Sequence, residues 1–295
     1  MKTKEVVIVS VARTPIGSFM GSLSKIKAPK LGAIAIKGAL NKINLNPNLV
    51  DEVFMGNVVS AGLGQAPARQ AALLAGIPDT VPCTTINKVC SSGMKAIMLA
   101  AQSIALGDTK IVVAGGMENM SSIPHYLHGR QGTKFGPTTL EDGMQKDGLV
   151  DAYDNVAMGV CADACATKFG FSREEQDEFA LSSQKKAQIA IANNKFDQEL
   201  IKVNQNGTIL NKDEHPRFDL KFSDLEKLKT VFKENGTVTP GNSSGINDGA
   251  AALFLTTLEE AEKKSIEPLV KIVSWASVGV DPSLMGLGPI EAVRK

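Results

Sequence analysis

Cys90 is the residue whose position in the sequence points most directly to chemistry. It lies in the segment NKVCSSG, residues 87–93, between a predicted strand and a predicted helix. The positive end of a helix dipole favours a thiolate at that place, and the free N–H groups there could stabilise an oxyanion on a substrate that the sulfur attacks. The alternative is a buried cysteine that packs as a small apolar side chain.

The other three cysteines are expected to be structural. Cys161 and Cys165 lie four residues apart on one face of a predicted helix, and no two further metal ligands lie at workable spacing. Cys83 lies inside a predicted strand. Four cysteines at irregular spacing in a chain of this length indicate reduced thiols rather than a disulfide framework.

The three histidines of the chain are weaker candidates for chemistry. His125 and His128 have a spacing that can bind metal, but a pair in a surface loop usually does not, so no metal site is expected. His215 is expected to be exposed. Arg217, two residues further on, is the better candidate for binding a phosphate group.

Two further segments could contribute to a site. Glu118 follows a strand end, where open α/β sheets bind ligands, and it is either an acid–base group or an anchor for loop N–H groups. We favour the anchor. Residues 241–249, GNSSGINDG, do not have the glycine order of a dinucleotide fingerprint or a P-loop. They form either a structural hairpin or a loop that lines a ligand.

The elements that must position these residues alternate in the first third of the chain. Short β-branched runs predict strands over residues 6–11, 53–59, 83–89 and 111–114. Apolar residues at helical spacing predict helices over residues 31–43, 66–75 and 91–106. This order implies parallel pairing with right-handed crossovers and therefore a layered α/β core.

The remainder of the chain is predicted to be a loop-and-helix insertion followed by a return to the core. Helices are expected at 156–168 and 172–194, the second with capping-box residues Ser172 and Glu175. A strand over 250–256, a helix over 258–264 and a strand-like run over 269–280 follow. We therefore predict three parts: a core domain of residues 1–120 plus 250–268, an inserted domain of 121–249, and the start of a second core domain at 269–295.

Composition excludes several functional classes. The 295 residues include 32 basic and 31 acidic side chains, for a net charge of +1, which gives no electrostatic footprint for nucleic acid or an anionic membrane. No apolar run is expected to reach transmembrane length, and the first residues have no signal-peptide pattern. A cytoplasmic protein is expected.

Five segments spread over the whole chain resemble the thiolase family, specifically the short-chain acetyl-CoA acetyltransferases. They are VARTPIGSFMGSL, NKVCSSGMKAI, AGGMENMS, LKTVFKENGTVTPGNSSGINDGAAA and SWASVGVDPSLMGLGP. The resemblance implies a thiolase-like layered αβα core with an inserted loop-and-helix domain. It also implies a second core domain of which this chain contains only the start.

The resemblance also implies a reaction and a set of roles. Cys90 would be acylated by a thioester, with its backbone N–H in an oxyanion hole, in the reversible Claisen condensation of two acetyl-CoA to acetoacetyl-CoA plus coenzyme A. Ser244 would contact the pantetheine arm, Arg217 the nucleotide end, and Met158 and Met285 the bound substrate, with Met285 a wall of a short acyl pocket. Family members form dimers or tetramers and use no further cofactor.

Two departures from the family pattern affect these expectations. Ala157 stands where many relatives carry a histidine beside the pantetheine. The sequence also ends before the family's Asn-Glu-Ala-Phe, Gly-His-Pro and Cys-x-Gly-Gly-Gly segments, which bring the catalytic asparagine, histidine and second cysteine. We therefore expect a truncated acetyltransferase with impaired activity. The alternatives are a non-catalytic acyl-CoA-binding or assembly protein, and one half of a split thiolase.

Overall fold

The computed structural model describes residues 4–130, 132–205 and 207–295, which divide into two compact units. Unit 1 comprises the described residues of 1–144, 197–214 and 246–274, and unit 2 comprises those of 145–196, 215–245 and 275–295. Residues 197–214 thus pack with the core unit, although they fall inside the segment expected to be an inserted domain. The division into 1–120 plus 250–268, 121–249 and 269–295 stays a prediction.

Unit 1 is built on a seven-stranded mixed sheet whose main path runs β11-β1-β10-β5-β3-β4. The strands are β1 (Val6–Arg13), β3 (Glu52–Gly56), β4 (Cys83–Ile86), β5 (Ile111–Asn119), β10 (Asn247–Thr257) and β11 (Val270–Lys271), and β2 (Gly17–Ser18) pairs with β10. The predicted parallel pairing is confirmed for β3 with β4 and with β5.

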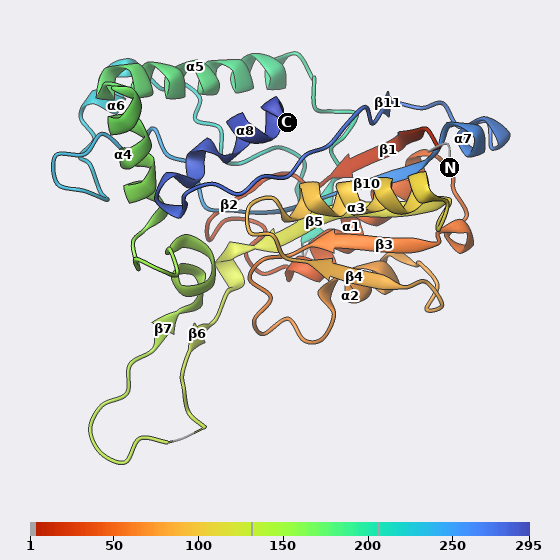
Figure 1. The fold of residues 1–295 in the computed structure, drawn as a ribbon, viewed down its shortest axis with the longest axis horizontal. Coiled ribbons are helices and arrows are strands. Elements are labelled where there is room, and N and C mark those ends of the chain that lie inside the picture. The colour runs from red at the N-terminus through yellow and green to blue at the C-terminus, as the bar shows by residue number, and fades with distance from the viewer. Residues whose placement is uncertain (1–3, 131, 206) are drawn as a thin grey trace. The chain divides into compact units, whose positions relative to one another are not determined.

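Parallel pairing was the wrong expectation for β1, because β10 lies between β1 and β5 and pairs antiparallel with both. Figure 1 shows this directly, since the blue β10 lies between the red β1 and the yellow β5. The register places Asp248 opposite Asn119 and Thr256 opposite Ile111. The strand that fills this place comes from more than 120 residues further along the chain, so local periodicity could not reveal it.

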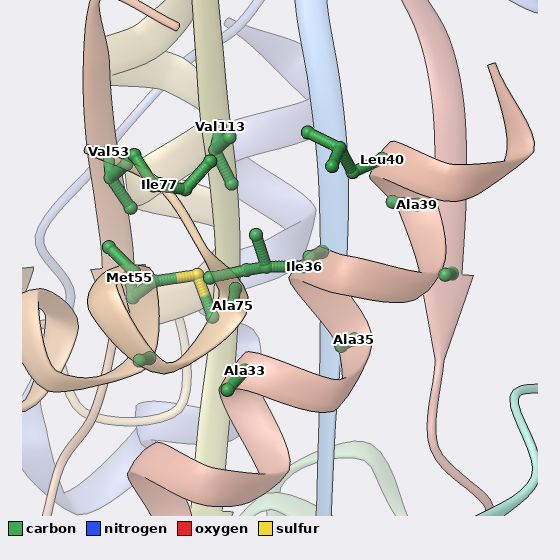
Figure 2. Close-up of a cluster of buried hydrophobic side chains, with 14 of the residues drawn as sticks. Ala33, Ala35, Ile36, Ala39, Leu40, Val53, Met55, Ala75, Ile77 and Val113 are labelled. Carbon is green, nitrogen blue, oxygen red and sulfur yellow. The ribbon is translucent and has the colours of Figure 1, made fainter. Parts of the chain in front are cut away.

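Helices cover both faces of this sheet, which confirms the layered α/β fold class. On one face, α1 (Ala28–Lys42) and α2 (Pro67–Ala75) pack on alternate strand residues such as Val53 and Met55. On the other face, α3 (Ser92–Leu106) packs on the intervening residues, such as Phe54. Figure 2 shows Ile36 of α1, Met55 of β3 and Val113 of β5 directed into the same core.

The helix α3 is also unusually apolar. Residues Val89–Leu106 have a mean hydropathy of 1.3 and are, by length and composition, sufficient to cross a membrane. The expectation that no apolar run reaches transmembrane length was therefore wrong. In the structure, Ala96, Ala100, Ala101 and Ile104 of α3 are buried against the sheet. Only 28% of the Val89–Leu106 window is buried in the structure, on the side of α3 that packs on the sheet.

Residues 197–214 are attached to β1 by a semi-buried ion network. The Arg13 guanidinium donates through Nε to Glu199 Oε1 at 2.6 Å, and through Nη1 and Nη2 to the two oxygens of Asp213 at 2.7 and 3.0 Å. Asp213 Oδ1 also accepts the Ile16 N–H at 2.8 Å. Further elements of unit 1 are η1 (Pro47–Leu49), η2 (Met120–Ser122), β6 (His125–Tyr126), β7 (Glu141–Asp142), β8 (Val203–Gln205), β9 (Thr208–Leu210) and α7 (Leu258–Lys263).

The strand predicted over 269–280 is wrong for most of its length. Only Val270 and Lys271 pair, antiparallel with β1, and Val273 is 87% exposed. Apolar β-branched residues form a strand only where a neighbouring strand takes up their backbone hydrogen bonds. Beyond Lys271 no described segment offers such an edge, so the run stays irregular.

Unit 2 is mainly helical. Its elements are η3, a π-helix (Gln145–Leu149), α4 (Met158–Phe169), α5 (Arg173–Ala192), α6 (Phe222–Glu226), η4 (Pro282–Leu287) and α8 (Gly288–Arg294). The two helices predicted here correspond to α4 and α5. The predicted capping box is also confirmed, since Ser172 Oγ accepts the Glu175 N–H at 3.1 Å and Glu175 Oε2 accepts the Ser172 N–H at 2.8 Å.

Candidate active site

Cys90 lies in a tight elbow between β4 and α3, and its side chain is exposed. Val89 immediately before it has φ +46°, in the left-handed region that β-branched residues rarely adopt. The elbow is closed from within by Ser92, whose Oγ accepts the Lys88 N–H at 2.8 Å and donates to the Val89 carbonyl at 2.6 Å. A strained residue held by such contacts presents the sulfur outward.

α3 begins two residues after Cys90. Ser91 is the N-cap residue and Ser92 begins the helix, so Cys90 stands beside the first turn as predicted. The positive end of the helix dipole favours negative charge there. The alternative that Cys90 is buried as a small apolar side chain is wrong, because the residue is exposed.

Glycines bring this helix start into contact with the strand ends. A Cβ on Gly56, the last residue of β3, would lie 2.6 Å from the Gly93 nitrogen and 2.7 Å from the Ser92 carbonyl carbon. A Cβ on Gly116 of β5 would lie 3.4 Å from the Gly93 Cα. Hence the position of the elbow is set by backbone packed on backbone, which leaves little room for movement.

Glu118 serves as the loop anchor that we favoured. Its Oε2 accepts the Val58 N–H at 2.8 Å, and its Oε1 accepts the Asn57 side-chain amide at 2.8 Å and the Val59 N–H at 3.4 Å. Burial raises the pKa of this carboxyl from 4.5 to about 7, although the three hydrogen bonds act in the opposite direction. The carboxyl therefore changes charge near neutral pH.

A separate hollow of about 260 Å³ lies within unit 2 and contains two of the predicted ligand-binding residues, Arg217 and Ser244. Its lining also includes Gln184, His215, Leu220, Leu225, Val231, Phe232, Pro240, Gly241, Ser243 and Gly245. A guanidinium, an imidazole and two hydroxyl groups above apolar side chains suit a ligand that has both an anionic and an apolar part.

The backbone around Arg217 is fixed by α5. Gln184 Oε1 accepts the Arg217 N–H at 3.0 Å, and Gln188 Nε2 donates to the Arg217 carbonyl at 3.1 Å. His215 was expected to be exposed, and this was wrong: it is half-buried because its ring packs on Gly245, where a Cβ would lie 2.1 Å from the ring Cε1. The glycine makes room for the imidazole in the hollow.

Ser244 is presented by a loop that is fixed by its own side chains. Asn242 Oδ1 accepts the Thr239 N–H at 2.8 Å, and Ser243 Oγ donates to the Thr239 carbonyl at 2.7 Å. Asn242 Nδ2 donates to Asp177 of α5 at 2.9 Å. Gly241, Ser243, Ser244 and Gly245 line the hollow, and residues 247–249 are part of β10, so both interpretations of residues 241–249 remain predictions.

The remaining predicted residues of unit 2 lie on α4 and η4, which pack against each other. Met158 is the first residue of α4 and is half-buried, whereas Met285 of η4 is 39% exposed. A Cβ on Gly286 would lie 3.4 Å from Cys165 Sγ. Cys161 is buried on the same helix, which agrees with packing roles for both cysteines.

Sequence reasoning missed three features of these sites. The role of Ser92 was not predicted, although a hydroxyl two residues after the cysteine could have indicated a side-chain-closed turn. Nothing in the sequence indicated the strained backbone of Val89, because valine rarely adopts a positive φ. Gln184 of α5 lies far from Arg217 in the sequence and carries no local pattern.

A family model and individual relatives with similar sequences point to the same family. Residues 6–259 match the model of the family described as "Thiolase, N-terminal domain". The chain is 48% identical to proteins named acetyl-CoA acetyltransferase from Schizosaccharomyces pombe and Cupriavidus necator, with 100% and 99% of the chain matched to 76% of each relative. It is 50% identical to the human mitochondrial acetyl-CoA acetyltransferase, with 98% of the chain matched to 69% of that protein.

Proposed function

The chain belongs to the thiolase family, and we propose that its activity is that of an acetyl-CoA C-acetyltransferase, with Cys90 as the nucleophile. In the first step the Cys90 thiolate attacks the carbonyl carbon of acetyl-CoA. A bond from carbon to the Cys90 sulfur forms, the bond to the coenzyme sulfur breaks, and coenzyme A leaves as a thiolate. One thioester replaces another, so the step is nearly balanced in energy.

The second step forms the carbon–carbon bond. A second acetyl-CoA loses an α-proton, which through solvent neutralises the coenzyme A thiolate released in the first step. The carbanion attacks the carbonyl carbon of the acetyl-cysteine, the carbon–sulfur bond breaks, and acetoacetyl-CoA forms as the Cys90 thiolate is released. The reverse sequence is thiolysis. In this proposal the Cys90 N–H and the positive end of the α3 dipole stabilise the oxyanion that develops in each step.

The observation that carries the proposal is the exposed Cys90 on a strained elbow at the start of α3. A cysteine that served only for packing would be buried and would not need a left-handed valine before it. The backbone contacts of Gly56 and Gly93 support the same role, because they leave the sulfur in one place relative to the helix start.

The hollow of unit 2 is proposed to bind the coenzyme. Arg217 would interact with phosphate groups at the nucleotide end, and Ser244 would donate to an amide of the pantetheine arm. Met158 and Met285 would contact the acyl portion, with Met285 limiting the chain length to acetyl and acetoacetyl groups. No further cofactor is part of this proposal.

The cellular location, the oligomeric state and the metabolic role of the protein are further parts of this proposal. Four free cysteines suit a reducing compartment, so we infer a cytoplasmic location. A homo-oligomer, and a place in fatty acid and ketone metabolism, follow from the family resemblance alone.

The test is the intact mass of the 295-residue chain after incubation with acetyl-CoA. We expect an acetyl adduct on the wild-type chain and on Cys165→Ser, and none on Cys90→Ser. Exposure of the acetylated chain to free coenzyme A should then remove the adduct, since the step is reversible. No adduct on a folded wild-type chain would refute the proposal.

An acyl-CoA-binding protein without turnover is the second candidate, because the hollow with Arg217 and Ser244 does not depend on Cys90. Isothermal titration with coenzyme A separates the two functions. Binding without any acetyl adduct would favour the binding protein, whereas an adduct that depends on Cys90 would favour the enzyme.

A further inference from the structure

Glu118 is connected to the Cys90 elbow through an unbroken series of hydrogen bonds within unit 1. The carboxylate accepts the N–H groups of Val58 and Val59 in the loop that follows β3. The Val58 carbonyl, on the same peptide as the Val59 N–H, accepts from Asn87 Nδ2 at 3.2 Å. Asn87 Oδ1 in turn accepts the Val89 N–H at 3.0 Å.

This series has a consistent direction. Each amide donates toward Glu118 and accepts on the side that faces the elbow, so an anion at one end polarises every bond in the same sense. The last donor is the N–H of Val89, the residue with φ +46° directly before the nucleophile. The series therefore holds the one peptide whose strained conformation decides where the sulfur points.

We propose that Glu118 is a positioning residue for Cys90, and that its ionised form holds the elbow in the reactive geometry through Val58, Val59 and Asn87. This inference rests on the proposed function of Cys90 as the acyl-accepting nucleophile. Glu118 itself makes none of its described contacts with Cys90, so it acts through the loop and not on the substrate.

The chemistry of the carboxyl makes the link responsive to pH. When Glu118 takes up a proton, one of its oxygens becomes a donor, and the neutral carboxyl accepts more weakly from the N–H groups than the carboxylate does. The side-chain amide of Asn57 donates to Glu118 through Nδ2. Its oxygen, Oδ1, is a buried acceptor that has no hydrogen-bond partner among the described residues. Since burial raises the pKa of Glu118 to about 7, both forms are populated near neutral pH.

The groups that face Glu118 directly are uncharged. They are the N–H groups of Val58 and Val59 and the amide of Asn57. On the neighbouring elements, Asp248 of β10 is hydrogen-bonded to Ser121, and the elbow carries Lys88 and the Cys90 thiol. The pH readout must therefore be compared with that of a variant that lacks the Glu118 carboxyl.

Alkylation of Cys90 by iodoacetamide provides this readout without any coenzyme. The rate on the 295-residue chain is measured from pH 5.5 to 9 by intact mass and peptide mapping. For the wild type we expect a rise in rate near pH 7 from the ionisation of Glu118. Glu118→Gln should lack this rise and react about tenfold more slowly at pH 8, the effect of one lost charge-assisted hydrogen bond.

Two further variants keep the inference falsifiable. Asn87→Ala breaks the series while it leaves Glu118 in place, and we expect it to slow the alkylation to the same extent. Glu52→Gln is the matched control, because burial also raises the pKa of this β3 carboxyl but none of the described hydrogen bonds links it to the elbow. It should retain the rise near pH 7 and the wild-type rate.

A general loosening of unit 1 would produce a different pattern. The half-buried Cys83 serves as an internal reporter, since it would become more reactive if the sheet opened. Faster labelling of Cys83 in Glu118→Gln, or a wild-type profile in either Glu118→Gln or Asn87→Ala, would overturn the inference. Failure of acetyl-CoA to acylate a wild-type chain that shows the rise near pH 7 would refute the proposed function and leave the link between Glu118 and the elbow in place.

Discussion

The buried carboxyl of Glu118 should make the stability of this protein depend on pH in a way that one substitution removes. The perturbation is Glu118→Gln, which keeps the shape of the side chain and abolishes its titration. Because the pKa is raised in the folded chain, from 4.5 to about 7, the folded state holds the proton more tightly than the unfolded state does. The stabilising contribution is therefore present at low pH and is lost as pH rises through 7.

The size of the effect follows from the two pKa values. A shift of about 2.5 units corresponds to about 3.4 kcal/mol over the whole titration, and linkage places about 2.5 kcal/mol of this between pH 5 and pH 8. The wild-type free energy of unfolding should fall by that amount more than the free energy of Glu118→Gln does over the same interval. Any constant cost of the lost hydrogen bonds cancels in this comparison.

The assay is urea denaturation followed by far-UV circular dichroism at half-unit steps from pH 5 to pH 8. Exposed Glu234→Gln serves as the control and should follow the wild type. If wild type and Glu118→Gln lose the same free energy of unfolding between pH 5 and pH 8, within about 0.5 kcal/mol, the carboxyl does not titrate as its burial requires and the reasoning fails.

Three more substitutions test other parts of the structure. Gly56→Ala places a Cβ 2.6 Å from the Gly93 nitrogen and should lower the free energy of unfolding by about 1–3 kcal/mol in urea melts, whereas Gly279→Ala, which meets no atom within 4 Å, should be neutral. Arg13→Ala leaves Glu199 and Asp213 unpaired, so residues 197–214 should become the first site of tryptic cleavage; an unchanged cleavage order would contradict this. Arg217→Ala should weaken coenzyme A binding about tenfold in calorimetry, with Cys90 alkylation unchanged.

The parts of the fold that could be predicted are those in which local pattern and final environment agree. The strand-and-helix order of residues 6–114 was predictable because each element alternates in the period of its own structure. Cys90 could be placed beside a helix start for the same reason. The capping box at Ser172 was predictable because it is satisfied by residues three apart in the sequence.

What could not be predicted depends on partners that are remote in the sequence. The position of β10 between β1 and β5 arises from long-range pairing, and residues 272–280 are irregular because an apolar run without a neighbouring edge does not become a strand. His215 was misplaced because its burial depends on Gly245, thirty residues away. Glu118 was predicted to anchor loop N–H groups, but the sequence did not identify Val58 as the partner.

The central place of β10 has a consequence for how the chain reaches its fold. β5 ends at Asn119 and β10 ends at Thr257, so at translation rates of 5–20 residues per second roughly 7–28 s pass before the last strand of this pairing is made. Throughout that interval the edges of β1 and β5 that will receive β10 are open. Open strand edges are templates for pairing with other chains, so a nascent chain of this protein has a defined period during which chaperone binding decides between folding and aggregation.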